Sequence, residues 1–184
     1  MTRAHAILFD LDGTLLDTAP DMIGALNLLR QEEGLEPLPF TTLRASVSHG
    51  AVRLITAGFP AAQADGFERL RQRFLALYAE NLAAGTRLFA GFEQVLAAFE
   101  AEDLPWGIVT NKPGWLTHPL LEQLGLNGRA CCVVSGDTVN ERKPHPLPLL
   151  HAAAVTGVSP DHCVYVGDAE RDIVAGRAAG MQTV

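Results

Sequence analysis

The sequence predicts an α/β fold in which a doubly wound parallel sheet carries an inserted helical cap. Three observations support this fold: short β-rich apolar runs bounded by polar or turn residues, stretches with helical spacing between them, and one long gap after the first run. The expected strands are Ala6–Phe9, Trp106–Val109, Cys131–Val134 and Cys163–Val166, and a fifth is expected to start within Met181–Val184.

Apolar residues at helical spacing precede the second and the fourth of these runs. Before the second run they are Phe92, Val95, Leu96 and Phe99, and before the fourth they are Leu147, Leu150 and Ala154. Spacings of three and four residues place side chains on one face of a helix. We therefore expect a helix in each place, which gives the alternation of a doubly wound sheet.

The interval between the first two runs indicates an insertion. It runs about 95 residues, whereas a crossover between parallel strands needs about a dozen. Thr18 with Pro20 opens a helix there that Gly34 closes, because proline fits the first helical turn and glycine the end. A second amphipathic face is marked by Phe67, Leu70, Phe74, Leu77 and Tyr78. We therefore expect residues 15–90 to form a helical cap.

The remaining residues, 1–14 and 91–184, are expected to form one catalytic core. Of the 184 residues, 48% are hydrophobic and 19% charged, as in folded globular proteins. A formal net charge of -7 argues against a nucleic-acid binder, which would need basic residues to neutralise phosphates. The apolar stretch before Asp10 is too short for a signal peptide or a membrane span. We expect a cytoplasmic protein without nucleic-acid or membrane partners.

The cysteines predict neither a disulfide framework nor a zinc site. Cys131 and Cys132 are adjacent in a strand-like run, where their side chains would point to opposite faces. Cys163 lies in another apolar run. We therefore expect three buried thiols.

Polar side chains follow each of the four expected strands. Asp10 and Asp12 follow the first, Thr110, Asn111 and Lys112 the second, Lys143 the third across a short loop, and Asp168 and Asp172 the fourth. Ligands of open α/β sheets bind beyond the carboxyl ends of the strands, so the four groups should converge on one rim. Neighbouring carboxylates disfavour one another unless a cation compensates, and Mg²⁺ prefers oxygen ligands. Asp10, Asp12 and Asp168 are therefore expected to bind Mg²⁺.

These residues resemble the four signature motifs of the haloacid dehalogenase superfamily of phosphotransferases. The matching positions are Asp10–Thr14 (DLDGT), Thr110, Lys143 and Gly167–Asp168 with Asp172, in the family's order and spacing. The resemblance covers the whole chain and implies a phosphatase in which Asp10 attacks phosphorus and forms an aspartyl-phosphate. Asp12 would protonate the leaving oxygen and then activate the hydrolytic water. Thr110 and Lys143 would hold the phosphoryl oxygens.

The resemblance also implies a set of metal ligands. Mg²⁺ would be bound by the carboxylates of Asp10 and Asp168 and by the main-chain carbonyl of Asp12. Asp172 would orient Lys143 or the waters on the metal.

Substrate specificity is expected to reside mainly in the cap. There, Ser46–Arg53 is the only stretch that combines glycine, histidine and arginine. We expect His49 and Arg53 to bind the substrate, together with Asn111 of the core. Arg53 would lie on the first turn of a helix, from which its guanidinium could grip a carboxylate. The alternative is that Arg53 is a solvated helix residue.

Two branches of the family fit the sequence. Val109–Pro113 and Lys143–Pro146 look like the phosphoglycolate phosphatases, and the N-acetylmuramic acid 6-phosphate phosphatases share both runs. The second branch is also similar in Leu88–Phe89, Trp106–Gly107 and Arg171–Ile173. Either branch implies a small phosphomonoester as substrate. A monomer or a homodimer is expected, and relatives of both branches are expected to extend past the end of this chain.

Other activities of the superfamily fit less well. Dehalogenases lack the second aspartate of the first motif, which is present here as Asp12. Phosphonate-cleaving relatives need a lysine in the cap, whereas the chain has only Lys112 and Lys143. A hexose-phosphate mutase shares all four motifs and stays open. A non-catalytic binding module would have no need for Asp10 and Asp12 at this spacing.

Overall fold

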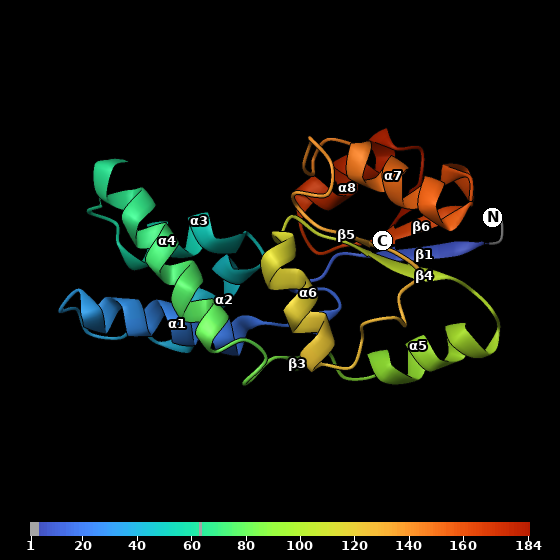
Figure 1. Cartoon of the computed structure of the whole chain (residues 1–184). Helices are drawn as coiled ribbons and strands as arrows, with labels where there is room; N and C mark the ends of the chain where they lie inside the picture. The colour runs from blue at the N-terminus through green and yellow to red at the C-terminus, as the bar shows by residue number, and fades with distance from the viewer. Residues whose placement is uncertain (1–3, 63) are drawn as a thin grey trace. The chain divides into compact units, whose positions relative to one another are not determined.

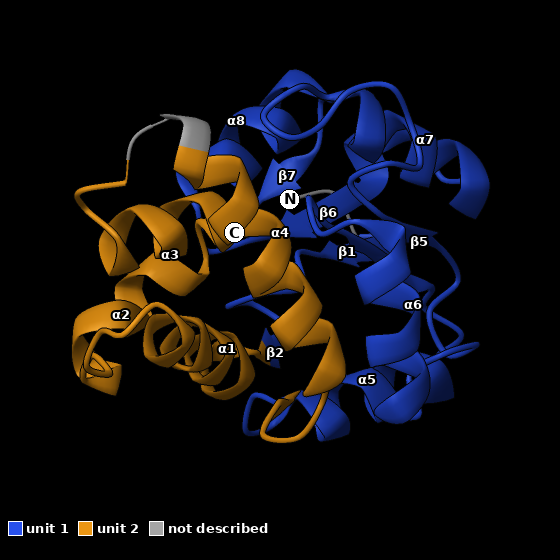
Figure 2. Ribbon diagram, turned by 60° about the vertical axis from the view of Figure 1, so that its left-hand side comes forward, with its two compact units in different colours: residues 1–16, 88–184 blue, residues 17–87 orange. Residues whose placement is uncertain are grey.

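The computed structural model describes residues 4–62 and 64–184. The chain forms two compact units: unit 1 is Met1–Leu16 with Leu88–Val184, and unit 2 is Asp17–Arg87 (Figure 2). The cap predicted from the sequence spans residues 15–90 and thus includes all of unit 2. The function of this segment as a cap stays a prediction. None of the described helices is long and apolar enough to cross a membrane.

Unit 1 is built on a parallel sheet (Figure 1). Within the described residues its strands are β1 (Ala6–Phe9), β4 (Trp106–Val109), β5 (Val133–Val134), β6 (Cys163–Val166) and β7 (Gln182–Thr183). Their order is β5-β4-β1-β6-β7, so β1 is central and the chain continues to one side of it and then to the other. Binding sites of open α/β sheets form at such a reversal, beyond the carboxyl ends of the strands.

The predicted strands agree with β1, β4 and β6 at every residue, and the fifth predicted strand is confirmed as β7. The third prediction is wrong in its first half, because β5 begins only at Val133. Cys131 and Cys132 each take part in one backbone hydrogen bond with β4 or its end, Cys131 N to Trp106 O and Ile108 N to Cys132 O. Cys131 lies before β5 and is exposed rather than buried as predicted.

Helices cover both faces of the sheet, which confirms the doubly wound fold. The helices are α5 (Phe92–Ala101), α6 (Gly114–Gln123), α7 (Leu147–Thr156) and α8 (Glu170–Ala178). Figures 1 and 2 show α5 and α6 on one face and α7 and α8 on the other. In α5, Leu96 is buried as predicted, whereas Val95 on the same predicted face is 41% exposed.

The buried face of α7 differs from the predicted one. Leu149, Ala152 and Ala153 pack in the core with β4, β5 and β6 residues, whereas Leu150 and Ala154 are exposed. Apolar residues occur all around this helix, so spacing alone could not select the face that packs on the sheet. The helix itself is confirmed.

Unit 2 is helical. Its helices within the described residues are α1 (Ala19–Glu32), α2 (Phe40–Val47), α3 (Gly50–Gly58) and α4 (Ala64–Glu80). As predicted, α1 has Thr18 at its amino-terminal cap and ends before Gly34. On the predicted apolar face of α4, Phe67 is half-buried, and the buried residues are Leu70, Phe74, Leu77 and Tyr78. The short strands β2 (Leu16–Asp17) and β3 (Arg87–Leu88) pair where the chain passes between the two units.

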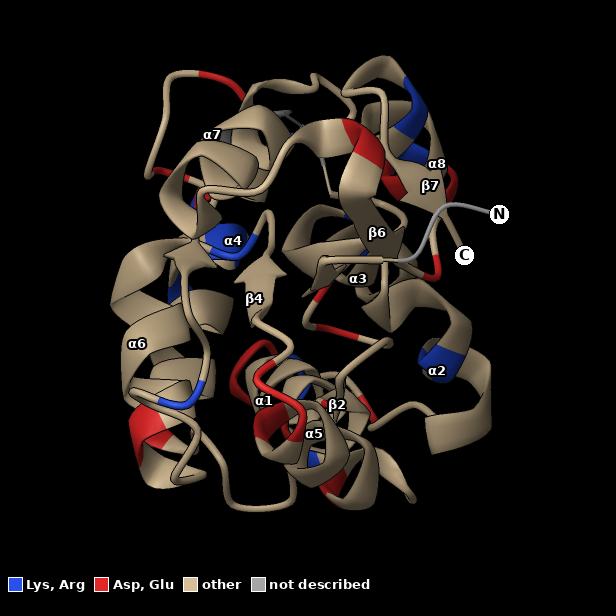
Figure 3. Ribbon diagram, turned by 90° about the vertical axis from the view of Figure 1, so that its right-hand side faces the viewer, with Lys and Arg blue, Asp and Glu red and all other residues tan. Residues whose placement is uncertain are grey.

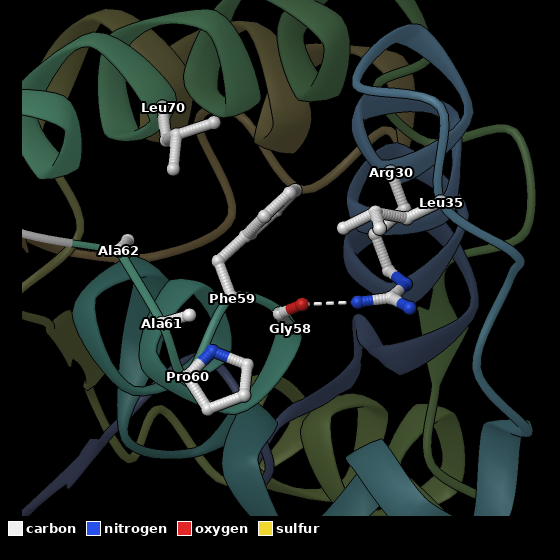
Figure 4. Close-up of a pocket in the computed structure, with 8 residues that line it drawn as sticks. All are labelled: Arg30, Leu35, Gly58, Phe59, Pro60, Ala61, Ala62 and Leu70. Atoms are coloured by element: carbon white, nitrogen blue, oxygen red, sulfur yellow. Dashed lines mark hydrogen bonds between the residues drawn. The ribbon is translucent and has the colours of Figure 1, made fainter.

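An apolar pocket of about 390 Å³ lies inside unit 2 (Figure 4). Its lining is Arg30, Leu35, Gly58, Phe59, Pro60, Ala61, Ala62 and Leu70. The Arg30 guanidinium donates hydrogen bonds to the Gly58 and Glu36 carbonyls and lies over the Phe59 ring. Because this charge is held by backbone oxygens and the other lining groups are apolar, the pocket is poorly suited to a phosphate.

Charged residues of both signs are spread over many elements (Figure 3). On unit 1, Arg129 pairs with Glu93 and Glu100, and on unit 2, Arg69 pairs with Glu33. Exposed pairs of this kind contribute little to stability, because water and salt screen their charges. Lys143 forms buried ion pairs with Asp10 and Asp172.

Candidate active site

The first motif forms a tight turn after the central strand. The Asp10 amide donates to the Val166 carbonyl at 2.9 Å, which fixes the end of β1 against β6. Gly13 has φ +92°, a left-handed conformation that favours glycine. Hydrogen bonds from Gly13 N to Leu16 O and from Leu16 N to Leu11 O close the turn. The turn keeps two aspartates, two residues apart, at the carboxyl edge of the sheet.

Lys143 is the centre of a buried polar cluster. Its ammonium lies 2.8 Å from Asp10 Oδ1 and 2.8 Å from Asp172 Oδ1. It also lies 2.9 Å from the Val109 carbonyl and 2.6 Å from the Tyr165 hydroxyl. The Lys143 side chain is 0% exposed, so its charge is balanced by these carboxylates rather than by water. Lys143 is thereby fixed beside the predicted nucleophile.

One oxygen of Asp10, Oδ1, is anchored by Lys143, and the other, Oδ2, is open in the sense that no described residue hydrogen-bonds to it. This Oδ2 is buried, and Arg171 Nη2 lies 3.9 Å from it. Burial raises the pKa of Asp10 above its ordinary value, Lys143 opposes the rise, and Asp172 and Asp12 add to it. The ionised carboxylate therefore carries a desolvation cost, which the charge of Lys143 opposes.

A divalent cation would offset the cost of burying the Asp10 carboxylate. In the part of the chain that the structure describes, Asp10, Asp168 and Asp172 offer carboxylate oxygens within 4.8 Å of one another, so this group could hold a metal ion. The open Asp10 oxygen needs a partner, and hard cations such as Mg²⁺ take carboxylate oxygens. Thr14 Oγ1 donates to Asp168 Oδ1 at 3.2 Å and thereby restrains the most exposed of the three acids.

Asp172 is already engaged on both oxygens. Oδ1 pairs with Lys143, and Oδ2 accepts from the Ala169 amide at 3.0 Å. Asp172 lies so close to Gly167 that a Cβ added there would be 2.4 Å from the aspartate Cβ, which only glycine allows. The predicted role of Asp172 in orienting Lys143 requires the ion pair between these two residues, and the role stays a prediction.

Asp12 faces a second lysine. Lys112 Nζ lies 2.9 Å from Asp12 Oδ1 and 3.2 Å from Oδ2, and the lysine side chain is 4% exposed. Among the described residues, the acids that could hold a metal ion together are Asp10, Asp168 and Asp172, and the Asp12 carboxylate is not part of this group. Lys112 is absent from the predicted site residues.

The loop after β4 carries the remaining predicted core residues. The buried Thr110 hydroxyl accepts a hydrogen bond from Lys112 N at 3.1 Å, so its own proton is free to be donated elsewhere. Asn111 bonds reciprocally with the main chain of Lys143, donating to its carbonyl at 2.9 Å and accepting from its amide at 3.0 Å. Asn111 thus ties this loop to the loop of Lys143, and a substrate contact through Asn111 stays a prediction.

Tyr165 is a site residue that sequence reasoning did not identify. Its hydroxyl donates to the Val109 carbonyl at 2.9 Å and accepts from Lys143. Burial raises the pKa of the phenol well above its ordinary value, so Tyr165 stays a neutral partner of Lys143. The available signal was a tyrosine in an apolar strand, where a buried hydroxyl needs a partner.

The family of the chain is decided by comparison with known proteins. The family model described as "Haloacid dehalogenase-like hydrolase" matches residues 7–184. The chain belongs to this family. The family predicted from the four motifs, and with it a hydrolase, is thereby confirmed.

Relatives of this haloacid dehalogenase-like hydrolase include named phosphatases. The phosphoglycolate phosphatase of Xanthomonas campestris pv. campestris (strain 8004) is 48% identical over 184 residues, which cover 100% of this chain and 83% of that protein. The N-acetylmuramic acid 6-phosphate phosphatase of Pseudomonas putida is 41% identical over 182 residues, covering 98% of this chain and 82% of that protein. A solved structure of a "predicted phosphoglycolate phosphatase from haemophilus somnus 129pt" has a TM-score of 0.87 at 28% identity, covering 100% of this chain and 85% of that one.

His49 and Arg53, the specificity residues predicted for the cap of this hydrolase, lie in unit 2. Helix α3 begins at Gly50, so Arg53 lies on its first turn as predicted, and His49 directly precedes the helix. Both side chains are exposed. The core residues of the four motifs are gathered at the carboxyl edge of the sheet in unit 1, whereas a role of His49 and Arg53 in substrate binding stays a prediction.

Proposed function

We propose that this hydrolase is a Mg²⁺-dependent phosphatase that cleaves a small carboxylated phosphomonoester through an aspartyl-phosphate on Asp10. The observation that carries the proposal is the state of Asp10. One of its oxygens is anchored by buried Lys143, and the other has no hydrogen-bond partner among the described residues. A carboxylate held in this way presents a fixed nucleophile beside a fixed positive charge.

The first half-reaction forms the covalent intermediate. A carboxylate oxygen of Asp10 attacks phosphorus while the bond from phosphorus to the leaving oxygen breaks. Asp12 donates a proton to the departing oxygen. Thr110 and Lys143 bind phosphoryl oxygens, since a loose phosphoryl-transfer transition state is stabilised mainly by positioning and by charge.

The second half-reaction releases phosphate. Asp12, now a carboxylate, takes a proton from water as the water oxygen attacks phosphorus. The bond between phosphorus and Asp10 breaks, and inorganic phosphate leaves. The same residue therefore acts as acid and then as base.

Asp10 and Asp168 would hold Mg²⁺ together with the main-chain carbonyl of Asp12. Asp172 is the less suitable ligand of the acidic group, because its oxygens are engaged by Lys143 and by the Ala169 amide. When bound, the cation supplies positive charge that neutralises the phosphoryl group.

Phosphoglycolate is the leading substrate, since relatives up to 48% identical are named phosphoglycolate phosphatases. N-acetylmuramic acid 6-phosphate is the second candidate, favoured by a relative at 41% identity. Both are carboxylated phosphomonoesters. A hexose-phosphate mutase is the alternative activity, and the cytoplasmic location and the monomeric or homodimeric state stay predictions.

A substrate panel tests the proposal. With Mg²⁺, we expect inorganic phosphate from phosphoglycolate or N-acetylmuramic acid 6-phosphate with a kcat/KM about 10- to 1000-fold above that for 4-nitrophenyl phosphate, because specific polar contacts add binding energy. Glucose 1-phosphate serves as the probe for mutase activity. Failure to release phosphate from every ester, or isomerisation of glucose 1-phosphate without release, would refute the proposed function.

Arg53 is our candidate for recognition of the carboxylate. Arg53→Ala is expected to lower kcat/KM for the preferred carboxylated ester by about 10- to 1000-fold and to leave 4-nitrophenyl phosphate within about threefold. Arg69→Ala is the matched control, since Arg69 is another exposed arginine of unit 2 and pairs with Glu33. Equal responses of both substrates to Arg53→Ala would identify Arg53 as a surface residue, and His49 would be tested next.

A further inference from the structure

We propose that Lys112 is a positioning residue that holds Asp12 in place for the hydrolysis of the phosphoenzyme. The inference rests on the proposed function and adds a residue to it. Its basis is the contact of one buried ammonium with both oxygens of the Asp12 carboxylate, at 2.9 Å and 3.2 Å.

Lys112 extends from a backbone that is itself fixed. Its amide donates to Thr110 Oγ1 at 3.1 Å, and its carbonyl accepts from Gly136 N at 2.8 Å and from Thr117 Oγ1 at 3.2 Å. The side chain is 4% exposed, so it lacks the freedom of a surface lysine. Because its backbone is fixed and its side chain is buried, the Lys112 ammonium has a defined position.

Asp12 has a fixed backbone as well. Asp12 forms a bridge with Leu16 inside the turn that Gly13 allows. Only its side-chain torsions remain to be set, and Lys112 sets them by binding both oxygens. A carboxylate oxygen has two lone pairs, so each oxygen keeps one for a proton after the contact with Lys112.

Each of the two lysines of the chain pairs with a different aspartate of the first motif. Lys143 binds the nucleophile Asp10, and Lys112 binds the acid and base Asp12. The Asp12 side chain is 15% exposed, so water reaches it while its partner stays buried. A base in this position is open to the hydrolytic water and restrained on its other side.

Orientation of a catalytic group has large kinetic effects, because a displacement of about 1 Å can cost about 100-fold in rate. Loss of Lys112 should therefore slow the steps that need Asp12. With an aryl phosphate the first half-reaction does not need the proton of Asp12, since the leaving group is stable as an anion. Only the attack of water on the phosphoenzyme should then slow, and the phosphoenzyme should accumulate.

The test uses Lys112→Met in the full chain with Mg²⁺ and 4-nitrophenyl phosphate as the probe. We expect steady-state turnover to fall about 10- to 100-fold, while the first turnover stays within about threefold of wild type. Rapid-mixing traces should show a burst of nearly one nitrophenol per active site, and acid quench should recover a matching amount of phosphoenzyme. Asp12→Asn should give a stronger form of the same behaviour.

Control variants separate positioning from a general loss of structure. Arg177→Met removes an exposed charge of α8 and should change neither phase. Lys112→Arg should recover part of the second step, because a guanidinium can also bind both oxygens of a carboxylate. If Lys112→Met does not fold, Lys112→Gln replaces it with the same expected accumulation.

The inference is overturned if the neutral variant slows the burst and the steady state equally, or changes neither. It is also overturned if the phosphoenzyme fails to accumulate although turnover falls. A wild-type protein and an Asp12→Asn variant that both give no phosphoenzyme would instead refute the covalent mechanism of the proposed function. The two failures are thus distinguishable in one set of measurements.

Discussion

Asp10→Asn should lower turnover by about four powers of ten or more, because an amide cannot form the acyl phosphate. Asparagine keeps the shape of the side chain, and Lys143 keeps its contacts with Asp172, the Val109 carbonyl and the Tyr165 hydroxyl. The fold and the phosphate-binding groups should therefore survive. Steady-state phosphate release, with circular dichroism as the check on folding, measures the effect.

A matched control for this substitution is Asp161→Asn. Asp161 is an exposed aspartate of unit 1 that precedes β6, whereas Asp10 follows β1 at the opposite edge of the parallel sheet. The control should keep wild-type turnover. A folded Asp10→Asn protein with near-normal turnover would exclude Asp10 as the nucleophile.

Chelation should abolish hydrolysis. In excess EDTA we expect turnover below about 1% of the Mg²⁺-loaded value, with full recovery on adding Mg²⁺, because catalysis needs a cation at a site rich in carboxylates. Asp10 and Asp168 are its proposed ligands, and the open oxygen of Asp10 is the group that most needs it. Phosphate release before and after chelation measures the effect.

A binding measurement separates the metal site from catalysis. A ligand that binds only the folded state raises the unfolding midpoint, so Mg²⁺ should stabilise the wild type and stabilise Asp168→Asn much less. Wild-type turnover that persists in excess EDTA would contradict the metal assignment. Equal stabilisation of wild type and Asp168→Asn would remove Asp168 from the ligand set.

The strands were predictable where local patterns are unambiguous. The sheet strands β1, β4 and β6 are short apolar runs with polar residues directly behind them, and parallel strands buried on both faces have this character. The packed face of α7 was not predictable, because Leu149 and Leu150 are equally apolar and only the tertiary structure selects Leu149. Cys131 was wrongly predicted to be a buried strand residue, because the apolar run does not reveal that β5 begins only at Val133.

The candidate site was predictable as a set of strand ends but not as a set of contacts. The rule that ligands bind beyond carboxyl ends of strands brought Asp10, Lys143 and Asp168 together. It did not reveal that Lys112 meets Asp12, since these residues are 100 positions apart and the contact depends on side-chain direction. Tyr165 was missed for a similar reason, because its hydroxyl reaches Lys143 from inside a strand.

The position of the phosphoryl group on the protein tests the covalent mechanism most directly. Asp12→Asn should be mixed with 4-nitrophenyl phosphate and Mg²⁺, quenched in acid within the first turnovers, digested, and mapped by mass spectrometry. We expect one phosphorylated peptide with the phosphoryl group on Asp10, lost on treatment with hydroxylamine as an acyl phosphate should be. A phosphoryl group on any other residue, or nitrophenol release with no phosphorylated peptide, would contradict the mechanism.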